Sequence, residues 1–155
     1  MKRILLIALG CSICVWADFT RDDTNGIVID NTANLQWQDD ATPGTGDEKK
    51  WTDAIDYCEN LDLNGTDWRI PNINELETLV DDGRYNSAIV SIFKHTNPHS
   101  YWSSTSVNAA PKLAQTIIFY SGTMKGFDKN ETQGKITVNG KEVNIHHYVR
   151  CVRDN

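Results

Sequence analysis

The chain has 155 residues, of which 39% are hydrophobic, and its formal net charge at pH 7 is −6. This length suits one domain with a sizeable buried core rather than two domains. The acidic balance repels nucleic acid, heparin-like chains and anionic lipid at long range, so we exclude these as general partners. Lys112, Lys125 and Lys129 are the candidates for a local basic patch, and we expect them to be solvated.

Residues 1–17 have the pattern of a secretory signal peptide. Two basic residues precede an apolar run from Ile4 to Trp16, and Ala17 supplies a small residue for cleavage. The run is shorter than the ~20 residues that cross a bilayer, which favours cleavage over anchoring. We therefore expect a secreted or periplasmic protein that begins at Asp18, has a net charge of −8 and is not inserted in a membrane.

An alternative interpretation is a lipoprotein anchored through Cys11. Its apolar region would be short, and Leu9 is an unusual residue so close to the cleavage position. Cleavage after Ala17 leaves an even pair of cysteines, whereas cleavage at Cys11 leaves Cys14 unpaired. The cysteine count favours the secreted product.

The first predicted elements are one strand and two helices. Residues 26–30 alternate as a strand, and Asn34 then occupies a position where a left-handed turn is tolerated. Apolar residues recur with helical period from Trp51 to Leu61. A second helix is predicted from Asn72 to Val80, because Glu75 completes a capping box with the asparagine.

The remaining elements are predicted to be short strands and loops. Residues 115–120 form an apolar strand, Asn139-Gly140 indicates a two-residue hairpin turn, and residues 148–153 alternate as a closing strand. Helices beside short, mostly antiparallel strands predict a single α+β domain over residues 18–155. Three long loops are predicted between these elements, at residues 82–100, 106–113 and 121–132.

Five aromatic and polar blocks are similar to a known family. They are Leu35 to Gln38, Trp51 to Cys58, Asp67 to Leu76, Tyr101 to Thr105 and Tyr148 to Arg153. In order and spacing, the chain from about residue 19 to residue 153 resembles the C-terminal domain family of the Legionella collagen-like adhesin, whose biochemical role is unknown. The resemblance implies a fold like that of a C-type lectin or a formylglycine-generating enzyme. The family-like settings of Cys58 and Cys151 also imply a disulfide between them, with two buried free thiols as the alternative.

The resemblance places the tryptophans of these blocks in the core, although aromatic rings of this kind also stack on sugars. Arg69 is interpreted as an ion-pair partner of Glu75. The hydroxyls of residues 103–105 lack the base and oxyanion hole of a nucleophile, so we expect them to bond to backbone. The tryptophans concerned are Trp37, Trp51, Trp68 and Trp102.

Metal sites receive little support from the sequence. Pro98 breaks the helix that would put His95 and His99 on one face, and the adjacent residues His146 and His147 point to opposite sides of a strand. Calcium is the remaining candidate, because acidic residues crowd a loop that contains Gly44 and Gly46, but the order of an EF-hand is missing. We expect a solvated acidic loop and no cofactor. Its acidic residues are Asp39, Asp40, Asp47 and Glu48.

We expect a non-catalytic binding module, adhesin-like in recognising an extracellular or envelope glycan or protein through its loops. Phe127 is the favoured contact, as an aromatic residue in a polar loop that would serve as an exposed anchor. Its alternative role is a packing contact with the hairpin. The full set of predicted contacts is Asn108, Lys112, Lys125, Phe127 and Asp128.

Two other classes of protein remain open. One is an envelope structural or assembly protein that binds another protein. The other is an enzyme related to the formylglycine-generating fold, whose chemistry uses free cysteines. A bridge between Cys58 and Cys151 would remove those thiols, which disfavours the enzyme.

Overall fold

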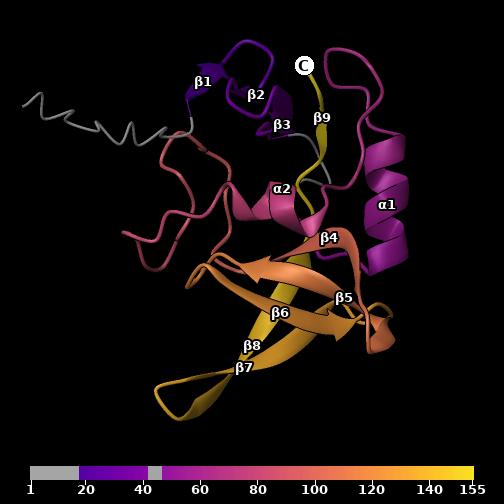
Figure 1. Ribbon diagram of the computed structural model, residues 1–155, viewed down its shortest axis with the longest axis vertical. Coiled ribbons are helices and arrows are strands. Elements are labelled where there is room, and N and C mark those ends of the chain that lie inside the picture. The colour runs from indigo at the N-terminus through magenta and orange to yellow at the C-terminus, as the bar shows by residue number, and fades with distance from the viewer. Residues whose placement is uncertain (1–17, 42–46) are drawn as a thin grey trace, which may run out of the picture.

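The computed structural model describes residues 18–41 and 47–155 (Figure 1). The predicted signal peptide, Cys11 and the two glycines of the acidic loop lie outside them. The described residues form β1 (Phe19–Asp22), β2 (Ile27–Asp30), β3 (Leu35–Gln38), α1 (Trp51–Glu59), α2 (Ile73–Glu77), β4 (Ser100–Val107), β5 (Ala110–Ile118), β6 (Thr123–Asp128), β7 (Gln133–Val138), β8 (Lys141–Tyr148) and β9 (Val152–Asp154). The predicted α+β class is confirmed. In this part of the chain no helix is long and apolar enough to cross a bilayer.

The strands form two sheets. The smaller sheet has the antiparallel order β1-β2-β3-β9, which joins the C-terminal strand to the first hairpins. The larger sheet has the order β6-β5-β4-β8-β7, and its β4–β8 pair alone is parallel. Figure 1 shows the two sheets at opposite ends of the molecule, with the β7–β8 hairpin projecting farthest from the smaller sheet.

Helix α1 turns the predicted apolar stripe toward the core, where Ala54 and Cys58 are fully buried. Helix α2 has the predicted capping box: Asn72 accepts from the Glu75 backbone N–H, and the Glu75 carboxylate accepts from the Asn72 N–H. This helix ends at Glu77 rather than at Val80. The reason is tertiary, because Val80 leaves the helix to form a β-bridge with Ile89.

The two predicted left-handed positions are confirmed. Asn34 has φ 58°, and Asn139 and Gly140 have φ 49° and 76° in the two-residue turn between β7 and β8. Two successive residues with positive φ give the primed turn that matches the twist of a hairpin.

Two of the three predicted loops are wrong. Residues 106–113 lie mostly in β4 and β5, and residues 121–132 contain β6. Both segments lie in hairpins or at a sheet edge and have few buried side chains, so they lack the apolar alternation of a half-buried strand. The predicted closing strand is also shorter, because Tyr148 ends β8 and the chain turns before β9.

The core has two clusters of buried side chains. One lies beneath α1 and contains Trp68 and Trp102, and the other lies between α2 and the sheets and contains Trp37. These three tryptophans are buried as predicted, whereas Trp51 is half-buried with the Lys129 ammonium 4.1 Å from its ring centre. The four indoles are therefore structural, not an open sugar-stacking surface.

A buried ion cluster connects the smaller sheet to the C-terminal segment. Asp39 is fully buried and pairs with Arg21 and with Arg150, whose Nη1 lies 2.8 Å from its Oδ1. The same carboxylate accepts hydrogen bonds from the backbone N–H groups of Lys94 and His95. Burial alone would raise the pKa of Asp39, but the Arg150 charge and these donors hold it below its usual value.

The predicted disulfide is present. Cys58 of α1 and Cys151, one residue before β9, are bonded, with a Cα–Cα distance of 5.5 Å. The bond attaches the helix to the segment that also carries Arg150, and it closes a sequence separation of 93 residues.

Replacing both cysteines with alanine should lower the free energy of unfolding by about 2–5 kcal/mol, because the unfolded chain regains the freedom of a long loop. Urea denaturation of the wild type and the Cys58→Ala/Cys151→Ala variant measures this loss. A peptide map without reductant that recovers both cysteines as free thiols would refute the bond itself.

Candidate functional site

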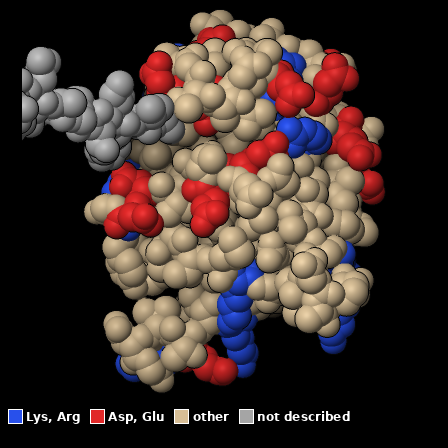
Figure 2. Space-filling view, in the orientation of Figure 1, with Lys and Arg blue, Asp and Glu red and all other residues tan. Residues whose placement is uncertain are grey.

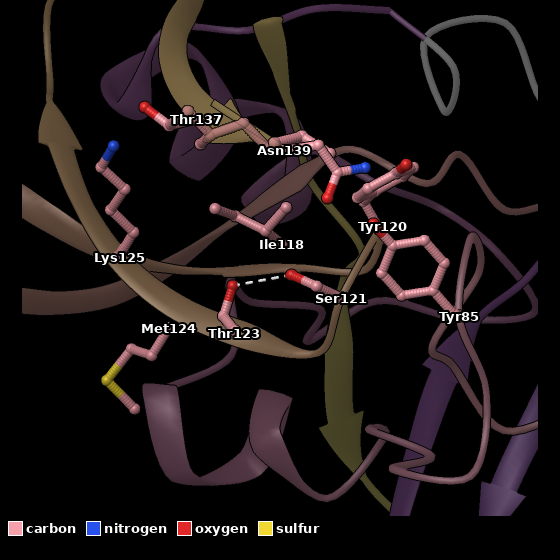
Figure 3. Close-up of a pocket in the computed structure, with 11 residues that line it drawn as sticks. Tyr85, Ile118, Tyr120, Ser121, Thr123, Met124, Lys125, Thr137 and Asn139 are labelled. Carbon is pink, nitrogen blue, oxygen red and sulfur yellow. Dashed lines mark hydrogen bonds between the residues drawn. The ribbon is translucent and has the colours of Figure 1, made fainter. Parts of the chain in front are cut away.

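A groove of about 420 Å³ lies between β6 and β7 (Figure 3). The β5–β6 turn and the first residues of β6 form one wall, and the second half of β7 with its turn forms the other. Ile118 and Tyr120 lie between them, and Tyr85 from the long loop after α2 closes one end. Residues from three separate parts of the chain thus meet at this groove.

The strand topology creates the groove. Strand β6 pairs only with β5, and β7 pairs only with β8, so the two strands are the free edges of the larger sheet. Strands β4 and β8 pair at only two positions, Ser100 with His147 and Tyr101 with Tyr148. Beyond them the β7–β8 hairpin is free to bend back toward β6. The two edges approach without backbone pairing, and side chains span the gap between them.

One end of the groove is aromatic and exposed. Tyr85 has 62% of its surface exposed, and its ring packs edge-to-face on Tyr120 at 4.6 Å. A hydrogen bond with the Tyr120 hydroxyl raises the pKa of Tyr85. Met124 is 45% exposed on the β6 side. Exposed side chains of this size in a concave site are typical of ligand anchors.

The polar groups of the groove are neutral apart from one lysine. The hydroxyls of Ser121 and Thr123 hydrogen-bond to each other at 2.8 Å, and Thr137 and Asn139 lie on the opposite wall (Figure 3). The Lys125 ammonium donates to the Lys135 carbonyl at 2.7 Å, across the gap between the strands. Among the residues that the structure describes, no histidine, cysteine or carboxylate lines the groove. This arrangement binds ligands by packing and hydrogen bonds.

The charge distribution agrees with a neutral or weakly basic site. Figure 2 shows acidic side chains gathered over the half of the molecule that contains the smaller sheet and α1. The opposite half, which carries the larger sheet, has few acidic groups on this face and several projecting basic side chains. An anionic ligand is therefore repelled less at this end than the net charge alone implies.

A smaller cavity of about 240 Å³ adjoins the groove. It shares Tyr120, Ile136 and Val138 with the groove and adds His99 and the 43%-exposed Val143 of β8. The half-buried side chains of Ile136 and Val138 in β7 therefore line both the groove and this cavity.

The five predicted contacts do not form one site. Lys125 lines the groove, but Asn108, Lys112 and Asp128 lie toward the other end of β5 and β6. Asp128 pairs in register with Leu113, and its carboxylate caps the following turn by accepting from the Asn130 N–H. Of these four residues, Lys125 alone lines this groove among the described residues.

The prediction that Phe127 is an exposed anchor is wrong. Its side chain is buried, with 7% exposure, and its ring centre lies 4.5 Å from that of His147. The ring also packs against Gly134 of β7, where there is no room for a Cβ atom. Because residues 123–128 form a strand, Phe127 faces the sheet interior, and the Lys125 ammonium lies 5.1 Å from its ring centre. It therefore closes the narrow end of the groove.

Two other interpretations of polar residues are confirmed. Arg69 forms two hydrogen bonds of 2.8 Å with the Glu75 carboxylate, although its side chain is 40% exposed. The Ser103 hydroxyl donates to the Gln115 backbone carbonyl. Both groups are thereby engaged in holding the fold.

The acidic loop does not assemble a calcium site from its described residues. The Asp39 carboxylate is engaged by two arginines and two backbone N–H groups, and Glu48 Oε1 lies 2.6 Å from Nδ1 of His146. Within residues 18–41 and 47–155, no group of three or more potential metal ligands is close enough to hold an ion.

The sequence reasoning missed Tyr85 and Tyr120, the most conspicuous groups of the groove. A usable signal was present at Tyr85, because it lies between Arg84 and Asn86 in a polar loop with no periodic apolar neighbours. The same criterion selects Phe127, and it fails there because residues 123–128 form a strand. The sequence places Tyr120 at the end of an apolar strand, and only the fold shows that it borders a groove.

His147 is a buried titratable group next to the end of the groove that Phe127 closes. It is fully buried between the rings of Trp102 and Phe127, with both ring centres at 4.5 Å. Burial, reinforced by the nearby His146 and His99, lowers the pKa of His147 to about 4. The imidazole is therefore neutral in the folded protein at pH 7.

The comparisons with known proteins identify a family. A family model described as the Lcl C-terminal domain matches residues 26–153 of the chain. No curated protein matches the chain, and no solved structure does.

Acid should destabilise the protein through His147. Between pH 6.5 and 4 the unfolded chain binds more protons than the folded one, so stability should fall as the pH drops through this window. The shift corresponds to a loss of up to about 3 kcal/mol. Urea denaturation at several pH values should show a flatter dependence for His147→Gln than for the wild type. Equal slopes for the two proteins would contradict the lowered pKa.

Because the Phe127 ring is buried, Phe127→Ala should lower the free energy of unfolding by about 3–5 kcal/mol, as other truncations of core side chains do. Met124→Ala on the same strand is the control, because Met124 is 45% exposed and should change stability much less. A Phe127→Ala protein with an unchanged melting temperature would show that the ring is not part of the core in solution.

Proposed function

Because the chain belongs to the Lcl C-terminal domain family, an adhesin-associated domain, we propose that it is a non-catalytic binding module that acts outside the cytoplasm. Its ligand is an extracellular or envelope glycan or protein. The scaffold is C-type-lectin-like, a proposal supported by the pairing of the C-terminal strand β9 with β3, which joins the two ends of the domain in one sheet. The module presents a concave surface on that scaffold and performs no reaction.

The groove between β6 and β7 is the observation that carries this proposal. It combines the exposed Tyr85 and the half-buried Tyr120 with apolar side chains of β5 and β7 and with neutral hydrogen-bonding groups. Ligand sites in proteins typically have this composition, a mainly apolar lining with a few polar groups that orient the ligand. Exposed tyrosine also contributes contact area at low entropic cost.

The disulfide supports a location outside the cytoplasm. Bridges such as Cys58–Cys151 form and persist in oxidising compartments, which agrees with secretion or a periplasmic location. The same bond argues against an enzyme of the formylglycine-generating type, since both described cysteines are engaged.

An envelope assembly protein is the second candidate. It is favoured by the two unpaired sheet edges, because exposed edges are templates for pairing with another chain. In that case the same groove would hold a protein component of the envelope, and no glycan would bind.

Tyr85→Ala should weaken ligand binding at least tenfold while leaving the melting temperature nearly unchanged, because the side chain is exposed. The ligand is sought on glycan and protein arrays with the oxidised protein, with and without added calcium. Lys112→Ala, at an exposed position away from the groove, is the matched control and should bind like the wild type. Binding that is lost in Lys112→Ala and retained in Tyr85→Ala would place the site at the other end of the sheet.

A further inference from the structure

We propose that the groove binds an extended peptide segment of a partner protein, added as a β-strand between the edges β6 and β7. The proposal rests on the binding function above and specifies its ligand class. The peptide would be a short stretch with apolar residues at alternate positions and no basic residue opposite Lys125.

The register of the hairpin shows which backbone groups of β7 are free. A two-residue turn makes Val138 and Lys141 a hydrogen-bonded pair, and such pairs recur at every second residue along an antiparallel ladder. The N–H and C=O groups of Gln133, Lys135 and Thr137 therefore point away from β8, toward the open edge. The Lys125–Lys135 hydrogen bond agrees, because that carbonyl faces the gap.

The Lys125 side chain lies in the space that an added strand would fill. Its ammonium crosses from β6 to the Lys135 carbonyl at 2.7 Å, an acceptor that the N–H of an added strand would use. The lysine side chain is long and exposed, so an incoming backbone can displace it at small cost. Once displaced, its charge remains beside the ligand, which disfavours a lysine or arginine there and favours an acidic or neutral residue.

The shape of the gap limits the length of the added strand. Phe127 packed on Gly134 closes one end, and the gap opens toward Ser121 and Asn139. The facing segments are therefore residues 123–125 of β6 and 135–138 of β7, which accommodate three or four residues of a strand. This length is typical of a recognition peptide, not of a whole domain.

The side chains of the groove provide alternate pockets. Ile136 and Val138 are half-buried on one face of β7, while Lys135 and Thr137 are exposed on the other. A strand laid beside β7 alternates in the same way, so every second residue would pack on Ile118, Ile136 and Val138. Tyr85 then covers one end of the groove.

The test uses the oxidised protein and a display library of random seven-residue peptides. We expect selection of peptides with alternating apolar residues, whose binding is then measured by calorimetry as synthetic peptides. Thr137→Pro removes one outward N–H of β7 without removing a bond to β8, and should weaken binding at least tenfold. Thr137→Val changes the side chain but keeps that N–H, so it should bind at least tenfold more tightly than Thr137→Pro, which separates the backbone from the side chain.

A second measurement covers the case in which Thr137→Pro does not fold. The selected peptide is N-methylated at alternate residues in two complementary versions. The version that blocks the amides facing β7 should bind at least tenfold more weakly than the other. Equal binding of the two versions, or equal affinity of folded Thr137→Pro and wild type, overturns strand addition.

The remaining outcomes distinguish this inference from the proposed function. If no peptide is selected but a glycan binds and Tyr85→Ala weakens that binding, strand addition is overturned while the binding module stands. If selected peptides and arrayed ligands all bind Tyr85→Ala as well as they bind the wild type, both proposals fail at this groove.

Discussion

The buried contact between Asp39 and Arg150 is the constraint on which the arrangement of the two sheets depends. Asp39 ends the β1–β3 meander, and Arg150 lies between the last two strands. The guanidinium also donates to the His95 carbonyl and lies 4.4 Å from the Phe93 ring centre, so it holds the long loop after α2. A buried pair of charges needs hydrogen bonds as well as its own attraction, and the neighbouring backbone supplies most of them. Arg150 Nη1 and Nη2 donate to the Gln38 and His95 carbonyls, whereas Nε has no hydrogen-bond partner among the described residues. The loop that carries Tyr85 is thereby held near its C-terminal end.

The groove between β6 and β7 is a consequence of how the strands of the larger sheet are connected. The parallel pairing of β4 with β8 is short, because β8 must then turn into the segment that carries Arg150 and the bridged Cys151. The hairpin therefore curves toward β6 without completing a barrel. Because Phe127 packs against Gly134 and His147, the β6 and β7 edges are close together at that end of the groove. They lie farther apart toward the β7–β8 turn. The groove is therefore the gap that remains because the larger sheet does not close into a barrel. A well-packed core lies beneath it.

The contrast between Phe127 and Tyr85 shows where sequence reasoning succeeds and fails. Both are lone aromatic residues among polar neighbours, and composition alone does not distinguish them. Phe127 is buried because its segment joins an existing sheet, a non-local event, whereas Tyr85 remains in a loop. Edge strands with exposed side chains carry little periodic signal, so residues 106–113 and 121–132 were assigned to loops. The site was missed for this reason.

Local chemistry in the sequence determined the features that need only near neighbours. These include the capping box of Asn72 and Glu75, the turn at Asn139-Gly140, the stripe of α1 and the pairing of Arg69 with Glu75. The family resemblance added the disulfide. Tertiary structure alone decided which strands became edges, where β6 and β7 face each other, and that Tyr85 reaches their gap. Those features depend on contacts between residues distant in the chain, whose free energies are set by packing and not by local pattern.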